Sequence, residues 1–305
     1  MQRTFKDYFI ILLKGIAMGA ADVVPGVSGG TIAFISGIYQ ELVESISGIK
    51  PSLLKTWKTE GFQPMWKEAN GGFLLSLMGG IFISVISLMN LVHYLLEFHT
   101  IKLWAFFFGL VLASIIYIGK QIENWSISTI IALIISAGVA FGITKLGTFQ
   151  GTDSLPFLFI AGAIASCAMI LPGISGSFIL VLLGAYAAIT EAVHALDLKK
   201  IAVVGVGVIT GLLSFSHLLK WLFKNYKNLT LAILTGFILG SLNKIWPWKH
   251  TLKSIVIDGK TKILKEASVL PSNYESEPQI VGAIILALIG FGVILLLERI
   301  ASKDK

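Results

Sequence analysis

Long apolar stretches make up most of the chain, and short runs of polar and charged residues separate them. Six of the stretches are long enough to cross a membrane as helices, because about 20 apolar residues span the hydrocarbon core of a bilayer. These predicted spans lie at about residues 72–96, 103–119, 127–146, 201–223, 229–246 and 279–299. The pattern predicts an all-α polytopic membrane protein.

Two further apolar segments, at residues 9–46 and 156–193, contain the same kind of interruption. The first is Val24-Pro25-Gly26-Val27-Ser28-Gly29-Gly30-Thr31, and the second is Leu171-Pro172-Gly173-Ile174-Ser175-Gly176-Ser177. A shift of 147 positions superimposes the two motifs, and also Gly37 on Gly184 and Tyr39 on Tyr186. This is an internal repeat. We predict a first repeat at residues 1–146 and a second at 147–305, each an interrupted segment followed by three spans.

Proline lacks an amide hydrogen and glycine adopts unusual dihedral angles, so each helix should break at its Pro-Gly pair, Pro25-Gly26 or Pro172-Gly173. A break inside a membrane persists only where protein, water or a ligand satisfies the freed backbone groups. The helix that starts after each break presents amides that favour an anion. We therefore expect a phosphate to contact these residues: Ser28, Gly29, Gly30, Thr31, Ser175, Gly176 and Ser177. The alternative is that the glycines only permit close helix packing and a bend. Occurrence at matching places in two halves favours a transport site.

Each interrupted segment is too long for one span and short for two, which favours a re-entrant hairpin with its tip at the Pro-Gly pair. Hairpins place more of the 24 lysines and arginines on the cytoplasmic face, whereas single broken spans place more on the other face, against the positive-inside tendency. A hairpin plus three spans crosses the membrane an odd number of times, so the second repeat should be inverted. Residues 55 and 197 should then lie on opposite faces, with both termini cytoplasmic.

Composition agrees with a membrane protein, since 55% of the residues are hydrophobic and only 13% are charged. The net charge of +7 comes from lysines spread over loops beside the spans. Such lysines are topology signals and headgroup contacts rather than a nucleic-acid surface. The single Cys167 excludes an internal disulfide, and no cluster of cysteine, histidine and carboxylate residues has metal-ligand spacing. We expect no metal, no cofactor and no nucleic-acid partner.

Ionisable residues near the motifs are few. Asp22 lies three residues before Pro25, and the repeat places Met169 at the equivalent position. Asp22 is either a proton-coupling group or a cap for backbone amides at the break, and the sequence leaves both open. His217 and Lys220 lie towards the cytoplasmic end of the span at 201–223. We include His217 as a candidate phosphate contact, while snorkelling to the headgroups explains Lys220 equally well.

Two polar segments have patterns of their own. Residues 249–278 form the longest loop, in which Asp258-Gly259 separates two strand-like runs. This predicts a small β-hairpin in an extracytoplasmic loop. Residues 47–71 mix lysines with aromatic residues, which suits a helix in the headgroup layer, either as a structural anchor or as a lipid-recognition element.

The two motifs and their surroundings resemble one bacterial family, the polyprenyl-phosphate transporters that translocate undecaprenyl phosphate. The resemblance rests on residues 19–31 with Gly37-Ile38-Tyr39, and on residues 167–177 with Leu183-Gly184-Ala185-Tyr186. It extends through Ser214-Phe215-Ser216 and Gly240-Ser241-Leu242 to Trp246-Pro247-Trp248. The resemblance implies a multi-pass protein of the bacterial cytoplasmic membrane that returns undecaprenyl phosphate from the outer to the inner leaflet, with proton coupling left open. The family pattern has a basic residue, often arginine, where this chain has His217.

A competing class is the integral undecaprenyl-pyrophosphate phosphatases, which also carry a P-G-x-S motif in inverted re-entrant hairpins. Their motif continues with an arginine, whereas Gly29 and Gly176 follow the serines here. Without an arginine to stabilise a transferring phosphoryl group, hydrolysis is disfavoured. A third class is an ion channel or a small-solute carrier. We expect a transporter rather than an enzyme, with undecaprenyl phosphate and membrane lipids as its partners; the oligomeric state is not encoded in these patterns.

Overall fold

A computed structural model of the protein describes residues 3–24, 27–149, 151–257 and 260–303. The first half contains α1 (Phe5–Val23), α2 (Gly29–Ile35), α3 (Tyr39–Gly48), α4 (Ser52–Glu60), α5 (Phe62–Glu68), α6 (Gly71–Phe98), α7 (Thr100–Gly119) and α8 (Ile127–Lys145). The second contains α9 (Leu155–Ile170), α10 (Gly176–Leu182), α11 (Tyr186–His194), α12 (Leu198–Asn225), α13 (Lys227–Ser241), η1 (Leu242–Ile245), β1 (Lys249–Ile257), β2 (Lys260–Ser268), η2 (Pro271–Asn273) and α14 (Ile280–Lys303).

The prediction of a helical, membrane-spanning chain is confirmed. Within the described residues, α6, α7, α8, α12 and α13 continued by η1 are long and apolar enough to cross a membrane. Helix α14 covers the sixth predicted span, and its apolar part runs from Ile280 to Leu296. Many apolar side chains on these helices are exposed, as expected where lipid rather than protein surrounds them.

The two halves have the same order of main helices. A shift of 147 positions relates α2 to α10, whereas a shift of 127 relates α6 to α12, which have the same length of 28 residues. The shift changes because α4 and α5 lie between α3 and α6, while α11 leads almost directly into α12. Residues 47–71 thus form two short helices rather than one, because Gly61 breaks them with a φ of +94°.

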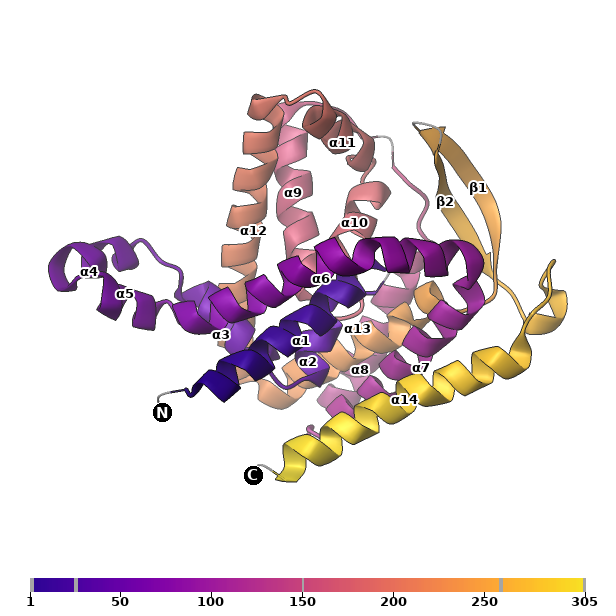
Figure 1. Ribbon diagram of the computed structural model, residues 1–305, viewed down its shortest axis with the longest axis horizontal. Coiled ribbons are helices and arrows are strands. Elements are labelled where there is room, and N and C mark those ends of the chain that lie inside the picture. Colours follow the sequence, from indigo (N-terminus) through magenta and orange to yellow (C-terminus); the bar gives the residue numbers. More distant parts are fainter. Residues whose placement is uncertain (1–2, 25–26, 150, 258–259, 304–305) are drawn as a thin grey trace.

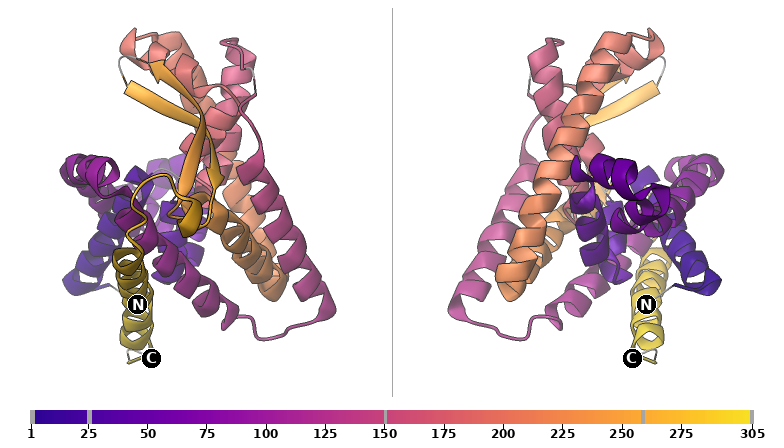
Figure 2. Two further views of the ribbon diagram at one scale, coloured as in Figure 1. Left: turned by 90° about the vertical axis from the view of Figure 1, so that its right-hand side faces the viewer. Right: turned by 90° about the vertical axis from the view of Figure 1, so that its left-hand side faces the viewer.

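Helix pairing also matches between the halves. Helix α1 packs along α6 as α9 packs along α12, whereas α7 packs along α14 and α13 along α8, so these last pairs join one half to the other. Gly109 of α7 and Gly236 of α13, related by the shift of 127, each lie where a Cβ atom would overlap a carbonyl of the partner helix. Such close backbone approach is typical of helix packing in membranes. Helices α9 to α12 form an arm that extends from the other helices (Figures 1 and 2).

Each interrupted segment folds into three helices rather than the two predicted. The extra bend falls at Gly37, between α2 and α3, and at Gly184, between α10 and α11, with φ of +73° and +75°. At both places the amide of the third residue after the helix donates to the carbonyl of the third-last helical residue, Ile38 to Ala33 and Ala185 to Leu180. This is a Schellman ending, which needs a left-handed residue and so explains the paired glycines. The axes of α10 and α11 differ by 107°.

The predicted β-hairpin is present. Strands β1 and β2 pair antiparallel, with Lys249 opposite Ser268 and an irregularity between Thr251 and Ser254. The predicted turn at Asp258-Gly259 lies outside the described residues. Two indole groups tie the hairpin to the helices, because Trp246 Nε1 donates to the Val269 carbonyl and Trp248 Nε1 to the Pro278 carbonyl, both at 2.8 Å.

Candidate functional site

The first break lies between α1 and α2, and its Pro25 and Gly26 are outside the described residues. Beyond them, Ser28 begins α2 and its Oγ accepts a hydrogen bond from the Gly30 amide at 3.2 Å. The Gly29 amide donates to Asp22 Oδ1 at 2.7 Å. The first two amides of α2 therefore have acceptors within the chain. Every residue of α2 is buried, so this motif lies inside the protein.

The second break, between α9 and α10, is more open. Pro172 is buried and Gly173 has a φ of +90°. Ser175 is half-buried, and its Oγ accepts from the Phe178 amide at 3.2 Å. Ser177 is exposed, with its hydroxyl 3.4 Å from that of Ser175. The second motif therefore offers polar side chains at the protein surface, unlike the first.

The two breaks contact each other. The Ser28 hydroxyl donates to the Leu171 carbonyl at 3.4 Å, and the Gly173 amide donates to Thr31 Oγ1 at 2.9 Å. Gly30 lies against α9, where a Cβ atom would be 2.7 Å from the Ile170 carbonyl. The chain thus brings Ser28, Gly30 and Thr31 onto the second break, although Ser175 and Ser177 are not part of these contacts.

The two interrupted segments pack differently. Helix α2 contacts α7 and α9, and α3 contacts α12 of the other half. The Tyr39 and Phe223 rings, for example, lie 5.9 Å apart. The main helix partners of α10 and α11 are α9 and α12 of their own half. Helices α2 and α3 of the first segment therefore contact the opposite half, whereas α10 and α11 of the second segment pack mainly on their own half.

Asp22 is held by its own break. Its carboxylate accepts from the Gly29 amide, and it lies so close to Gly29 that a Cβ atom there would displace it. Of the two roles open from the sequence, the geometry shows the amide cap. A proton-coupling role stays a prediction.

His217 is not brought together with the serines. It is exposed on α12, with its Nδ1 2.7 Å from the Leu213 carbonyl one turn earlier, which is the bond that an Nδ1–H tautomer makes. Lys220 is also exposed. A phosphate contact by His217 therefore stays a prediction that no described contact supports.

A cluster of charged residues beside the second break was not found from the sequence. Lys244 of η1 places its Nζ 4.8 Å from the centre of the Phe178 ring, and Glu266 of β2 lies 3.6 Å from Nζ of both Lys244 and Lys249. Lys249 is buried with its Nζ 4.0 Å above the Trp104 ring. Burial lowers the pKa of Lys249 to about 8, although Glu266 opposes the shift. The sequence placed Lys244 at the end of a span, and only the fold shows that α10 lies beside it.

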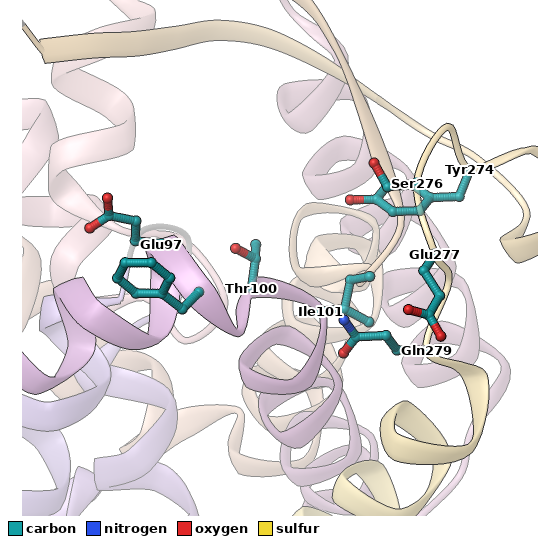
Figure 3. A pocket seen from close by; sticks show the side chains of 8 residues that line it. Glu97, Thr100, Ile101, Tyr274, Ser276, Glu277 and Gln279 are labelled. Atoms are coloured by element: carbon teal, nitrogen blue, oxygen red, sulfur yellow. The ribbon is translucent and has the colours of Figure 1, made fainter.

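The described cavities lie away from both motifs. One of about 210 Å³ lies between the junction of α6 with α7 and the segment before α14, and its lining includes Glu97, Thr100, Glu277 and Gln279 (Figure 3). Another of about 120 Å³ lies at the bend between α2 and α3, where Tyr39 and Lys227 contribute to its lining. No group of three metal-ligating side chains occurs among the described residues.

Comparison with known proteins identifies the class of transporter. A family model described as VCA0040-like, undecaprenyl phosphate translocase-like, matches residues 18–264. The chain belongs to this family. A protein from Vibrio cholerae serotype O1, named polyprenyl-phosphate transporter, is 48% identical over 302 residues, which cover 97% of this chain and 98% of the relative. A polyprenyl-phosphate transporter from Staphylococcus aureus is 36% identical over 258 residues, covering 78% and 86%.

Membership of the undecaprenyl phosphate translocase-like family confirms the resemblance that the motifs indicate, and it supports a transporter rather than a phosphatase. No solved structure matches the chain. The contact between the two breaks can be tested by mutation.

Gly30→Ala should destabilise the protein by about 1–3 kcal/mol, the usual cost of overpacking, because the new Cβ would meet the Ile170 carbonyl. Gly79→Ala on α6 is the control, since a Cβ atom there meets nothing within 4 Å. It should be neutral or stabilising by up to about 1 kcal/mol, because alanine favours a helix. Thermal unfolding of the purified variants in detergent measures both, and equal stability of the two would contradict the contact.

Proposed function

We propose that the protein moves undecaprenyl phosphate from the outer to the inner leaflet of the bacterial cytoplasmic membrane. The observation that carries the proposal is near-full-length similarity to a protein named polyprenyl-phosphate transporter. The resemblance of the motifs to the polyprenyl-phosphate transporters supports the proposed direction. The test is purified protein in liposomes, given undecaprenyl phosphate or its pyrophosphate. Movement of the phosphate between leaflets without release of inorganic phosphate is expected, and hydrolysis of the pyrophosphate would instead favour an enzyme.

The proposed architecture is a pair of inverted repeats, each with a re-entrant hairpin before three spans. Two observations support it: the matching order of main helices in the two halves, and the exchange of equivalent helices in the α7–α14 and α13–α8 pairs. Inversion places related elements at opposite faces of the membrane, as in transporters that alternate access to a central site.

The proposed phosphate site comprises the hydroxyls and amides of both motifs. In this structure Asp22 and Ser28 already accept from the first two amides of α2. A phosphate bound there would therefore replace the Asp22 carboxylate. The lipid headgroup would therefore contact the exposed Ser177 and the half-buried Ser175 before it contacts the buried first motif. The prenyl chain would stay in lipid while the headgroup passes between the breaks.

The headgroup would move from one motif to the other when the two interrupted segments change the half on which they pack. Helices α2 and α3 contact the opposite half here, whereas α10 and α11 pack mainly on α9 and α12 of their own half. In the exchanged state α10 and α11 would dock on the opposite half and α2 and α3 would leave it. This exchange would open the first motif and close the second. Rocking of repeats about a central site is the usual mode for such architectures.

Topology can be tested by cysteine labelling from each side of the membrane. Cys167 is first replaced by alanine, and Lys55→Cys and Leu198→Cys are made at exposed positions of α4 and α12. Membrane-impermeant reagent should label the first from the cytoplasmic side only and the second from the outside only. Labelling of both from one side would refute the inverted arrangement.

Ser177→Ala should weaken binding of undecaprenyl phosphate by about 1.5–3 kcal/mol, the usual value of a hydrogen bond to a charged group. Ser28→Ala tests the first motif, although it also removes the cap of the Gly30 amide. Ser87→Ala is the matched control, because Ser87 is exposed on α6 and donates only within that helix. Titration of the lipid into purified protein gives the affinities. Unchanged affinity in both motif variants would place the phosphate elsewhere, and His217→Ala would be the next test.

Asp22→Asn separates the two roles of that residue. The asparagine oxygen can still accept from the Gly29 amide, so the amide cap predicts a folded protein whose transport keeps its pH dependence. The measurement is the rate of translocation in liposomes between pH 5.5 and 8, with wild type as control. Loss of that pH dependence in a folded variant would show that Asp22 carries the coupled proton.

A further inference from the structure

We propose that Lys244, supported by Lys249, binds the lipid phosphate at the second break, and that Glu266 pairs with these lysines while the site is empty. The inference rests on the proposed function. Neither motif contains a basic residue, and the inference assigns Lys244 as the cation that would contact the phosphate.

Phe178 contacts both Lys244 and the second motif. It follows Ser177 directly, and its amide donates to Ser175 Oγ at 3.2 Å. The Lys244 Nζ lies 4.8 Å from the centre of the Phe178 ring. The ammonium group therefore lies over the ring of the residue that directly follows the two serines. A phosphate bound to their hydroxyls would be within reach of the flexible lysine side chain.

The backbone holds Lys244 in this position. Gly173 packs against the end of α13, where a Cβ atom would lie 2.6 Å from Ser241 Oγ and 3.0 Å from the Ile238 Cα. Lys244 follows three residues after Ser241, in η1. The break and the lysine are thus parts of one packed unit, which favours a constant spacing between them.

The charges of the cluster leave an excess of one positive charge. Two ammonium groups share one carboxylate, and both separations of 3.6 Å exceed those of a good hydrogen bond. Lys249 has other partners, because its Nζ donates to the Lys244 carbonyl at 2.7 Å and lies above Trp104. Lys244 is the more exposed of the two lysines, with 27% of its side chain accessible against 8% for Lys249. Lys244 is therefore the lysine that can turn to an anion.

The equivalent position in the first half carries no such charge. The shift of 127 relates Lys244 to Tyr117, and the shift of 147 relates Asp22 to Met169. The second motif thus has a cation nearby, while the first has an anion. A phosphate would be bound more tightly at the second motif, and ionised Asp22 would favour its departure from the first.

The experiment measures binding of undecaprenyl phosphate to purified full-length protein in phosphatidylcholine nanodiscs. Lys244→Gln should weaken binding by about 10- to 100-fold, the range expected for loss of one charged hydrogen bond. Lys244→Arg should retain affinity, because it keeps the charge. Glu266→Gln should strengthen binding, because it removes the competing carboxylate. The control is Lys200→Gln, which breaks an ion pair with Asp153 at the other end of the arm and should change nothing.

Each other outcome has a defined meaning. Unchanged affinity in a folded Lys244→Gln protein, checked by thermal unfolding, overturns the inference while leaving the proposed function intact. Failure of the wild type to bind undecaprenyl phosphate overturns the proposed function. Competition by phosphatidic acid at equal affinity assigns the cluster to anionic lipids in general and also overturns the inference. Competition by inorganic phosphate alone supports recognition of the headgroup.

Discussion

The structure depends on how two broken helices satisfy the backbone groups that the breaks set free. In an apolar surrounding each unpaired amide or carbonyl costs several kcal/mol, so the breaks need partners. The Gly173 amide finds Thr31 Oγ1, the Leu171 carbonyl finds the Ser28 hydroxyl, and the Gly29 amide finds Asp22. The second break therefore takes both of its partners from the first motif, whereas the first break caps its own amides with Asp22 and Ser28. These contacts add to the α7–α14 and α13–α8 pairs that join the two halves.

The two halves of the chain have similar long helices but different motifs. The packing of long helices repeats closely, down to the paired glycines of α7 and α13. The motifs themselves diverge in burial, in docking and in charge. The long helices form a nearly symmetric frame, whereas the two motifs that they surround are not symmetric. Such an arrangement can hold one motif closed while the other is open. A difference of this kind is what a transporter with two access states requires.

The long spans could be predicted because they depend on properties local to the chain. Apolar stretches of sufficient length give α6, α7, α8, α12 and α13, and strand propensity around Asp258-Gly259 gives the hairpin. The second bends at Gly37 and Gly184 were missed, although the repeat aligned these glycines, because a Schellman ending can be read only when the end of the helix is known. The lysine cluster was missed for another reason. The contact between Lys244 and Phe178 joins residues of different helices. No pattern in the sequence around Lys244 or around Phe178 predicts this contact.

Helices α4 and α5 have no counterpart between α11 and α12 of the second half. These helices enter the first half between α3 and α6 without disturbing the correspondence of α6 with α12 or of α7 with α13. The joint between an interrupted segment and its first span thus has different lengths in the two halves of one chain. It accommodates a two-helix module in one half while the order of the long helices stays the same. The same joint, in either half, is a natural position for inserting a reporter domain.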